Sequence, residues 1–256
     1  MVKFDDKDPE KVLHAFGWHA LEIPKPEDMV YAITGNESQV LTVKLSHGNM
    51  VRGEPGTMFY LSEGIHQSVS CDQFFERCCT GESCCTVNFS NDGSSGRDAY
   101  AALTPNFPTA KVVPVDLSSP HVGGTLIAQR GAYMASYGDV GVNISCDCNF
   151  MLCCCGGMGL VRQKLVGSGT VFLSSTGTMV QKVLAPGETI LVDTHCLMAF
   201  AGSCKMDLRQ AGNVLGMVGG GEGIFNTTVT GPGLVIVQSM NEIMFLQSLV
   251  PKVWRR

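Results

Sequence analysis

The residues best suited to chemistry are cysteines near the middle of the chain. Cys146 and Cys148 lie shortly before the run Cys153, Cys154 and Cys155. Thiolates that converge in a tetrahedron are preferred ligands of zinc and other soft metals. Cys146, Cys148, Cys153, Cys154 and Cys155 are therefore the candidate metal ligands, and zinc is the only cofactor that the sequence suggests.

Two other interpretations of this cysteine segment stay open. Its spacing is not that of a standard zinc motif, and neighbouring residues of a strand point to opposite faces of a sheet. The thiols could instead form a redox-active or lipid-modified cluster. They could also be small buried side chains that fill a tight core.

Two glycine-rich loops resemble phosphate cradles at first sight. GGMG spans residues 156–159 and GGGEG spans 219–223. Neither ends in the Lys-Ser/Thr pair of a P-loop, and no helix is predicted to follow. We interpret both as turns that need glycine for its conformational freedom.

A Cys/His pair can form an activated nucleophile, and His195 lies next to Cys196 and close to Asp193. The side chains of residues 195 and 196 would diverge on a strand. A local surface histidine is the simpler interpretation. The sequence predicts no catalytic residues and a protein that is not an enzyme.

The chain contains an internal repeat. Residues 156–175, GGMGLVRQKLVGSGTVFLSS, align without gaps on residues 220–239, GGEGIFNTTVTGPGLVIVQS, at a spacing of 64. The same spacing places 123–136 on 187–200. Repeats of this size indicate structural units that bury their apolar faces against one another.

A fainter first copy lies nearer the N-terminus. A spacing of 76 places Met58 on Met134 and Cys78-Cys79 on Cys154-Cys155. The 12 extra residues of this copy fall after Phe89, in SNDGSSGRDAYAA, which predicts an extended surface loop.

The predicted fold is all-β, with three related β-sandwich-like units in one chain in a pseudo-threefold arrangement. Short segments bounded by Gly, Pro and Asp turns predict strands at 189–192, 197–200, 205–208, 224–229 and 234–238. We expect an N-terminal segment 1–29, one domain 30–250 and a tail 251–256. Within the domain, repeat one covers about 30–110, repeat two 111–176 and repeat three 177–250.

Composition excludes several classes of protein. The net charge is −5 and no segment clusters Lys or Arg, so nucleic acid is not an expected partner. The apolar runs span only a few residues, against roughly 20 for a transmembrane helix.

The start, MVKFDDKDPEKV, has neither a signal core nor a presequence pattern. The 12 cysteines include adjacent runs that are unlike a disulfide framework. We expect a cytoplasmic protein with reduced thiols and no transmembrane span.

Several segments resemble one known family. GGEGIFNTTVTGPGLVIVQS at 220–239, GEPGTMFYLSEGI at 53–65, GAYMAS at 131–136 and the stretch 165–193 are similar to the altered inheritance of mitochondria protein 24 family. The resemblance covers about residues 30–245. It implies the β-sandwich of the tryptophan RNA-binding attenuation protein, repeated within one chain. It also implies mitochondria as the alternative location, because the fungal member is associated with the organisation of the inner membrane.

Two functions follow as hypotheses. The first is a non-enzymatic scaffold or interaction protein, with an unknown protein or a membrane surface as its partner and a homo-oligomer left open. It predicts an exposed apolar patch or sheet edge. The alternative is a small-ligand or metal-binding protein that uses the Cys146 to Cys155 segment, and it predicts converging sulfur atoms.

Overall fold

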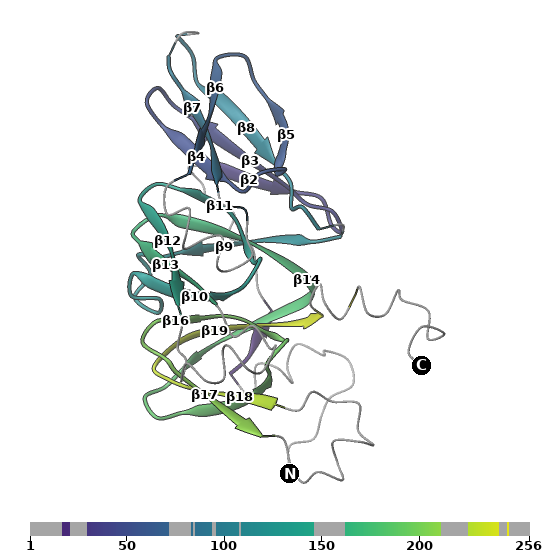
Figure 1. The fold of residues 1–256 in the computed structure, drawn as a ribbon, viewed down its shortest axis with the longest axis vertical. Helices are drawn as coiled ribbons and strands as arrows, with labels where there is room; N and C mark the ends of the chain where they lie inside the picture. Colours follow the sequence, from purple (N-terminus) through teal and green to yellow (C-terminus); the bar gives the residue numbers. More distant parts are fainter. Residues whose placement is uncertain are drawn as a thin grey trace, which may run out of the picture. The chain divides into compact units, whose positions relative to one another are not determined.

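The protein is built from antiparallel strands. A computed structural model describes residues 17–20, 30–71, 83, 85–93, 96–107, 109–145, 162–210, 225–240 and 245 (Figure 1). It has two compact units: the middle unit, Ile23–Ser175, and the terminal unit, which joins Met1–Glu22 to Thr176–Arg256. The predicted all-β class is confirmed. No helix among the described residues is long and apolar enough to cross a membrane.

The described part of the middle unit contains three sheets. Their orders are β2-β3-β8-β5, then β9-β14-β11-β4-β7-β6, and β12-β13-β10, with β14 contributing its residues up to Ser175. The strands are β2 (Tyr31–Thr34), β3 (Val40–Leu45), β4 (Met50–Gly53), β5 (Met58–Leu61), β6 (Ile65–Ser70), β7 (Thr86–Asn91), β8 (Ala99–Leu103), β9 (Lys111–Asp116), β10 (Thr125–Gln129), β11 (Tyr133–Tyr137), β12 (Val140–Ser145), β13 (Arg162–Gly167) and β14 (Thr170–Leu184).

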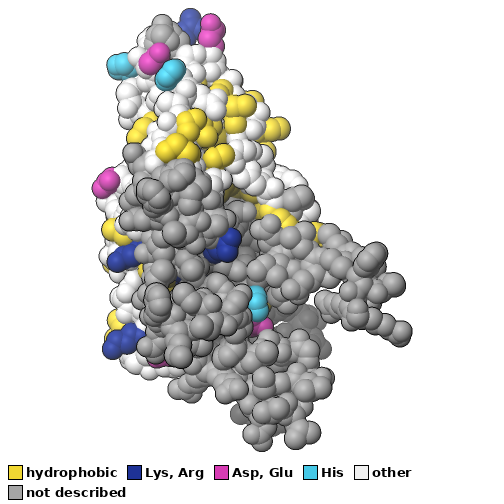
Figure 2. All heavy atoms as spheres, viewed as in Figure 1, with side chains coloured by type: hydrophobic (Ala, Val, Ile, Leu, Met, Phe, Trp, Pro, Cys, Tyr) yellow, Lys and Arg dark blue, Asp and Glu magenta, His cyan; other side chains and the backbone are white. Residues whose placement is uncertain are grey.

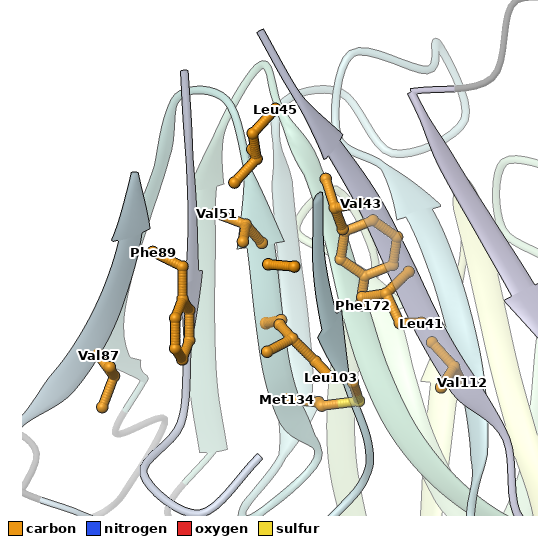
Figure 3. Close-up of a cluster of buried hydrophobic side chains, with 12 residues drawn as sticks. Leu41, Val43, Leu45, Val51, Val87, Phe89, Leu103, Val112, Met134 and Phe172 are labelled. Atoms are coloured by element: carbon orange, nitrogen blue, oxygen red, sulfur yellow. The ribbon is translucent and has the colours of Figure 1, made fainter. Parts of the chain in front are cut away.

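The core of the middle unit lies between the first two of these sheets (Figure 3). Leu41 and Val43 alternate with less buried residues along β3, as expected for a strand with one face toward the core. They belong to one buried cluster with Phe89 of β7, Met134 of β11 and Phe172 of β14. Full burial of such a side chain contributes about 1.5–3 kcal/mol. The sandwich therefore takes strands from both repeat one and repeat two.

The terminal unit contains two described sheets. One has the order β16-β19-β14-β1, in which β14 contributes its second half, and the other has the order β15-β18-β17. The remaining strands are β1 (His19–Ala20), β15 (Thr189–Asp193), β16 (Leu197–Ala201), β17 (Lys205–Gln210), β18 (Phe225–Thr230) and β19 (Gly233–Met240). These bounds confirm the strands predicted in repeat three to within two residues at each end.

Strand pairing recurs at the spacing found in the sequence. Thr125 pairs with Val166 in β10–β13, and Thr189 pairs with Thr230 in β15–β18, so both partners move by 64 positions (189 − 125 and 230 − 166). The register shift at Tyr133/Ala135 in β11 recurs at Leu197/Ala199 in β16. Repeats two and three thus share their ladders, while the threefold arrangement of the three repeats stays a prediction.

Two details predicted for repeat one are wrong. The register shift of β5 lies at Met58/Tyr60, so Met58 corresponds to Tyr133 and not to Met134. The predicted long loop after Phe89 is shorter, because β7 continues to Asn91 and β8 begins at Ala99. The alanines and Leu103 of β8 are buried in the sandwich, so this part of the insertion is sheet.

Candidate functional site

The predicted metal ligands lie outside the described residues. This applies to Cys146, Cys148 and the run Cys153–Cys155, and also to the glycine-rich loops 156–159 and 219–223. Within the described ranges, no group of three or more His, Cys, Asp and Glu side chains could hold a metal ion. The zinc hypothesis therefore stays a prediction.

Asp193 is the last residue of β15, and His195 and Cys196 lie in the turn that leads to β16. The Asp193 carboxylate accepts a hydrogen bond from the His195 backbone N–H (2.7 Å) and lies 3.2 Å from His195 Nδ1. Burial, followed by the negative charge of Asp193, raises the pKa of the Cys196 thiol. A raised pKa disfavours the thiolate, which is the nucleophilic form. The geometry fits a local turn better than an activated nucleophile.

One pair of cysteines is joined by a disulfide, which the sequence reasoning missed. Cys71 and Cys85 have their Cα atoms 4.1 Å apart. Reduced thiols were expected, and this expectation is wrong for the pair in this structure. The cause is the β6–β7 register, whose last pair is Ser70 with Thr86, so that the next two residues lie opposite each other. Their position at the ends of neighbouring strands was the available signal.

The buried thiol of Cys204 has an ordinary structural environment. Its Sγ donates to the carbonyl oxygen of Pro232 over 3.4 Å. Burial raises the pKa of this thiol. Cys204 is therefore an inert core thiol, unlike a reactive surface cysteine.

The clearest candidate for an interaction site is an exposed group of apolar side chains on β5 and β8. This aromatic surface consists of Met58, Phe59, Tyr60 and Tyr100, which are 47%, 58%, 45% and 46% exposed. The Phe59 and Tyr60 ring centroids lie 5.2 Å apart, and those of Tyr60 and Tyr100 lie 6.1 Å apart in an edge-to-face arrangement. Figure 2 shows hydrophobic side chains gathered on the part of the middle unit that carries these strands.

The exposure of these side chains follows from the strand that carries them. Met58, Phe59, Tyr60 and Leu61 are four consecutive apolar residues, whereas a half-buried strand alternates. Of these, only Leu61 packs against the core cluster. Tyrosine and phenylalanine combine a large apolar area with few rotatable bonds, and they are enriched at protein interfaces. The run TMFYL was the sequence signal for this surface, although its meaning depends on which strand lies at the sheet edge.

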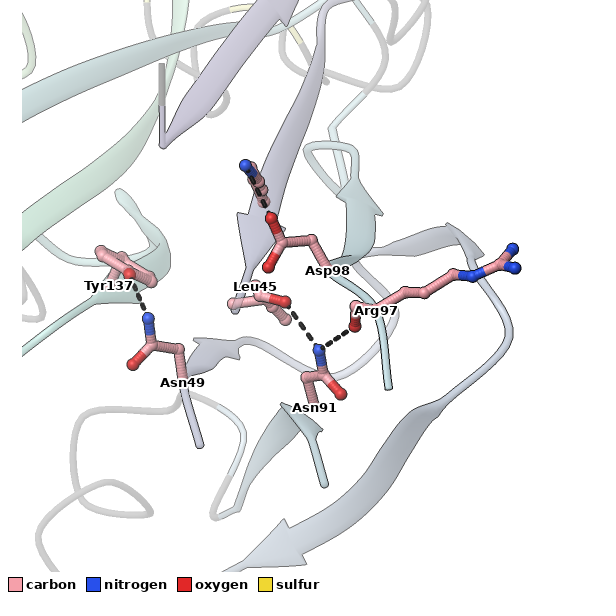
Figure 4. A network of polar contacts seen from close by, with 7 residues as sticks. Leu45, Asn49, Asn91, Arg97, Asp98 and Tyr137 are labelled. Atoms are coloured by element: carbon pink, nitrogen blue, oxygen red, sulfur yellow. Dashed lines mark hydrogen bonds and ion pairs between the residues drawn. The ribbon is translucent and has the colours of Figure 1, made fainter. Parts of the chain in front are cut away.

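A polar network fixes the loop that leads into the aromatic surface (Figure 4). The Asn91 side chain is 1% exposed, and its Nδ2 donates to the carbonyl oxygens of Leu45 (2.8 Å) and Arg97 (3.0 Å). Its Oδ1 accepts from the Gly93 N–H (2.9 Å). Asn91 thereby joins the ends of β3 and β7 to the start of β8. Its role is to position β8, which carries Tyr100.

Lys44 and Asp98 form an ion pair near this network, with Nζ and Oδ2 2.8 Å apart. The hydrogen bond from Lys44 lowers the pKa of Asp98, and the same bond raises the pKa of Lys44. Both side chains are largely exposed, so the pair contributes little to stability.

The fold and this surface define an all-β sandwich protein with an exposed aromatic face. Residues 31–240 match the family described as mitochondrial biogenesis AIM24, and the chain belongs to this family. The family resemblance of the sequence segments is confirmed. The crystal structure of protein SPYM3_0169 from Streptococcus pyogenes is similar, with a TM-score of 0.65 and 23% sequence identity over 86% of this chain and 97% of that chain. It shows the same fold. No curated protein is significantly similar to the chain.

Proposed function

We propose that the chain is a non-enzymatic scaffold or interaction protein that binds an apolar partner through the aromatic surface. The observation that carries this proposal is the exposure of Met58, Phe59, Tyr60 and Tyr100 on two neighbouring strands. Single exposed apolar residues are ordinary, but contiguous groups mark interaction sites. The family description, mitochondrial biogenesis, supports a role in organising mitochondrial or other membranes.

We commit to a protein partner with an apolar contact area. The hydroxyl groups of Tyr60 and Tyr100 can donate hydrogen bonds at the rim of an interface while the rings are covered. Rigid aromatic rings also lose little conformational entropy when they are buried. A partner that covers this surface would bury rings that already contact one another.

The test is a single charge on the central strand β8. Tyr100→Lys places a cation in the aromatic surface without touching the edge of the sheet. The matched control is Val69→Lys on β6, which replaces a side chain that is 66% exposed. We expect crosslinking and quantitative mass spectrometry to recover a specific protein with the wild type and with Val69→Lys, and to lose it with Tyr100→Lys.

Two outcomes would contradict the proposal. Equal recovery with Tyr100→Lys would remove the aromatic surface from the interaction. Sedimentation of the wild type with phosphatidylcholine–cardiolipin vesicles, lost only in Tyr100→Lys, would replace the protein partner by a membrane surface. Circular dichroism of each variant checks that the sheets are intact.

A further inference from the structure

Inside the middle unit, one ladder joins one repeat to the next. Strand β11 of repeat two pairs with β4 of repeat one, with Arg52 opposite Ser136. The Glu54 N–H also donates to the Met134 carbonyl oxygen over 2.9 Å. This antiparallel pairing makes β11 an inner strand with a neighbour on each side.

Strand β5 of repeat one is the equivalent of strand β11 of repeat two. The carbonyl oxygen of Thr57 accepts from the Thr104 N–H (2.7 Å), as that of Ala132 accepts from the Ser174 N–H (2.7 Å). Each strand then has its register shift one residue later. Positions in β5 and β11 therefore differ by 75 (132 − 57), and Leu61 corresponds to Ser136.

Strand β15 of repeat three is the equivalent of strand β4 of repeat one. The carbonyl oxygen of Asn49 accepts from the Asn91 N–H (3.1 Å), and that of Glu188 accepts from the Gly231 N–H (2.9 Å). On this side β4 pairs with β7, which contains Asn91. On the same side β15 pairs with β18, which ends just before Gly231. Positions in β4 and β15 therefore differ by 139 (188 − 49), and Leu191 corresponds to Arg52.

Both equivalent strands have an open edge. In the described part of the chain, β5 pairs with β8 alone and β15 with β18 alone. The Ser62 N–H points to β8, where it donates to the Tyr100 carbonyl oxygen, so the backbone groups of Leu61 point away from β8. By the same alternation from Glu188, the backbone groups of Leu191 point away from β18. Each open edge presents unused donors and acceptors.

Burial marks the same two strands. Met134, in the paired strand β11, is 1% exposed, whereas its equivalent Phe59 in β5 is 58% exposed. Leu191 in β15 is 61% exposed. Apolar side chains thus lie exposed on β5 and β15. These are the two strands that lack a partner of the kind that β4 and β11 provide for each other.

We propose that β5 of one molecule pairs with β15 of a second molecule of this chain, antiparallel, with Leu61 opposite Leu191. The junction reproduces the β4–β11 ladder between molecules. Because the two edges differ, the contact is head-to-tail, and it forms a ring if the rotation closes and a filament if it does not. In this proposal a second copy of the chain is a partner of the scaffold. Only the use of the assembly as a scaffold rests on the proposed function.

The test uses one blocked edge per variant. Leu191→Pro removes the outward N–H of β15, at a position where an edge strand tolerates proline. Phe59→Lys places a charge on β5, which discourages edge pairing. Val69→Lys on β6 is the matched control. In the described ranges β6 and its equivalents β12 and β17 each pair with one strand only, so none of them forms a ladder between repeats there. Size-exclusion chromatography with light scattering gives the mass over a concentration series.

We expect wild type and Val69→Lys to form species larger than a dimer, and each edge variant alone to be a monomer. An equimolar mixture of Leu191→Pro and Phe59→Lys should form a dimer and nothing larger, because one intact β5 and one intact β15 remain. Met58→Lys replaces Phe59→Lys if the latter does not fold.

Three results would overturn the assembly: a monomeric wild type at every concentration, an assembled Leu191→Pro variant, or a mixture that stays monomeric. Leu191→Pro leaves Met58, Phe59, Tyr60 and Tyr100 unchanged. Retention of the protein partner by this variant, together with its loss in Tyr100→Lys, separates failure of the assembly from failure of the proposed function.

Discussion

Cys71 and Cys85 are directly opposite each other, one residue beyond the last pair of the β6–β7 ladder, and are joined by a disulfide. The bond closes a loop in which the two residues are 14 positions apart. Closing such a loop restricts the unfolded chain far more than the folded sheet, where the register already holds the two residues together.

Removing this disulfide should lower the free energy of unfolding. For a loop of this length the chain-entropy model gives about 3 kcal/mol. We expect that loss in the Cys71→Ser/Cys85→Ser double variant, measured by urea unfolding. Cys196→Ser is the control and should change the value by less than about 0.5 kcal/mol. If a reducing agent leaves the wild-type midpoint unchanged, the disulfide does not contribute as predicted.

Loss of the Asn91 side-chain amide should destabilise the middle unit more than loss of the Asn49 amide. Asn91→Ala removes three hydrogen bonds and leaves the carbonyl oxygens of Leu45 and Arg97 without this donor. Because these groups are buried or partly buried, we expect a loss of about 2–4 kcal/mol in urea unfolding. Asn49→Ala, which removes one exposed hydrogen bond to the Tyr137 hydroxyl, should cost under about 1 kcal/mol. Equal losses in the two variants would contradict the assignment.

Local pattern was enough to predict the strands of repeat three. Pro186 and Gly187 mark the turn before β15, and alternation predicts the strand that follows. The repeat spacing of 64 comes from residue identities, and the ladders of β10–β13 and β15–β18 differ by the same number. These features depend on neighbours in sequence or on comparison of the chain with itself.

The aromatic surface and the disulfide could not be predicted in the same way. Whether Phe59 is exposed depends on whether another strand lies beside β5, and its equivalent Met134 is buried. Whether Cys71 meets Cys85 depends on a register between strands separated by a long connection. Both are decided by tertiary pairing, to which residue type contributes little.

Tyr31 should make stability fall at alkaline pH. Burial, followed by the negative charge of Asp116, raises the pKa of its phenol, and its ring packs edge-to-face on Phe172 at 4.9 Å. The unfolded chain ionises this tyrosine near pH 10, while the folded chain retains the proton to higher pH. The contribution is therefore complete below about pH 10 and is lost as pH rises through the folded pKa.

The measurement for Tyr31 is the midpoint of thermal unfolding as a function of pH. The wild type should lose stability above about pH 10 more steeply than Tyr31→Phe, which has no proton to release. Asp116→Asn should lie between them, because one of the two causes of the shift is removed. Parallel curves for wild type and Tyr31→Phe would show that Tyr31 does not titrate differently in the folded and unfolded states.

Gly169 should tolerate no side chain, although it is not among the glycines with a positive φ. A Cβ atom there would overlap the carbonyl oxygen of Tyr137 and lie 2.9 Å from Val140 Cγ2. The backbone cannot move away easily, because the Gly169 N–H donates to the Asp139 carbonyl oxygen (2.9 Å) and its own carbonyl oxygen accepts from the Leu117 N–H (3.1 Å). We expect Gly169→Ala to cost about 2 kcal/mol in urea unfolding.

Gly141→Ala in β12 is the matched control, since the atom nearest to a Cβ added there is 3.7 Å away. That variant should be neutral or slightly stabilising, because alanine lowers the entropy of the unfolded chain. Equal stability of the two variants would mean that the β13–β14 turn relaxes around the added methyl group.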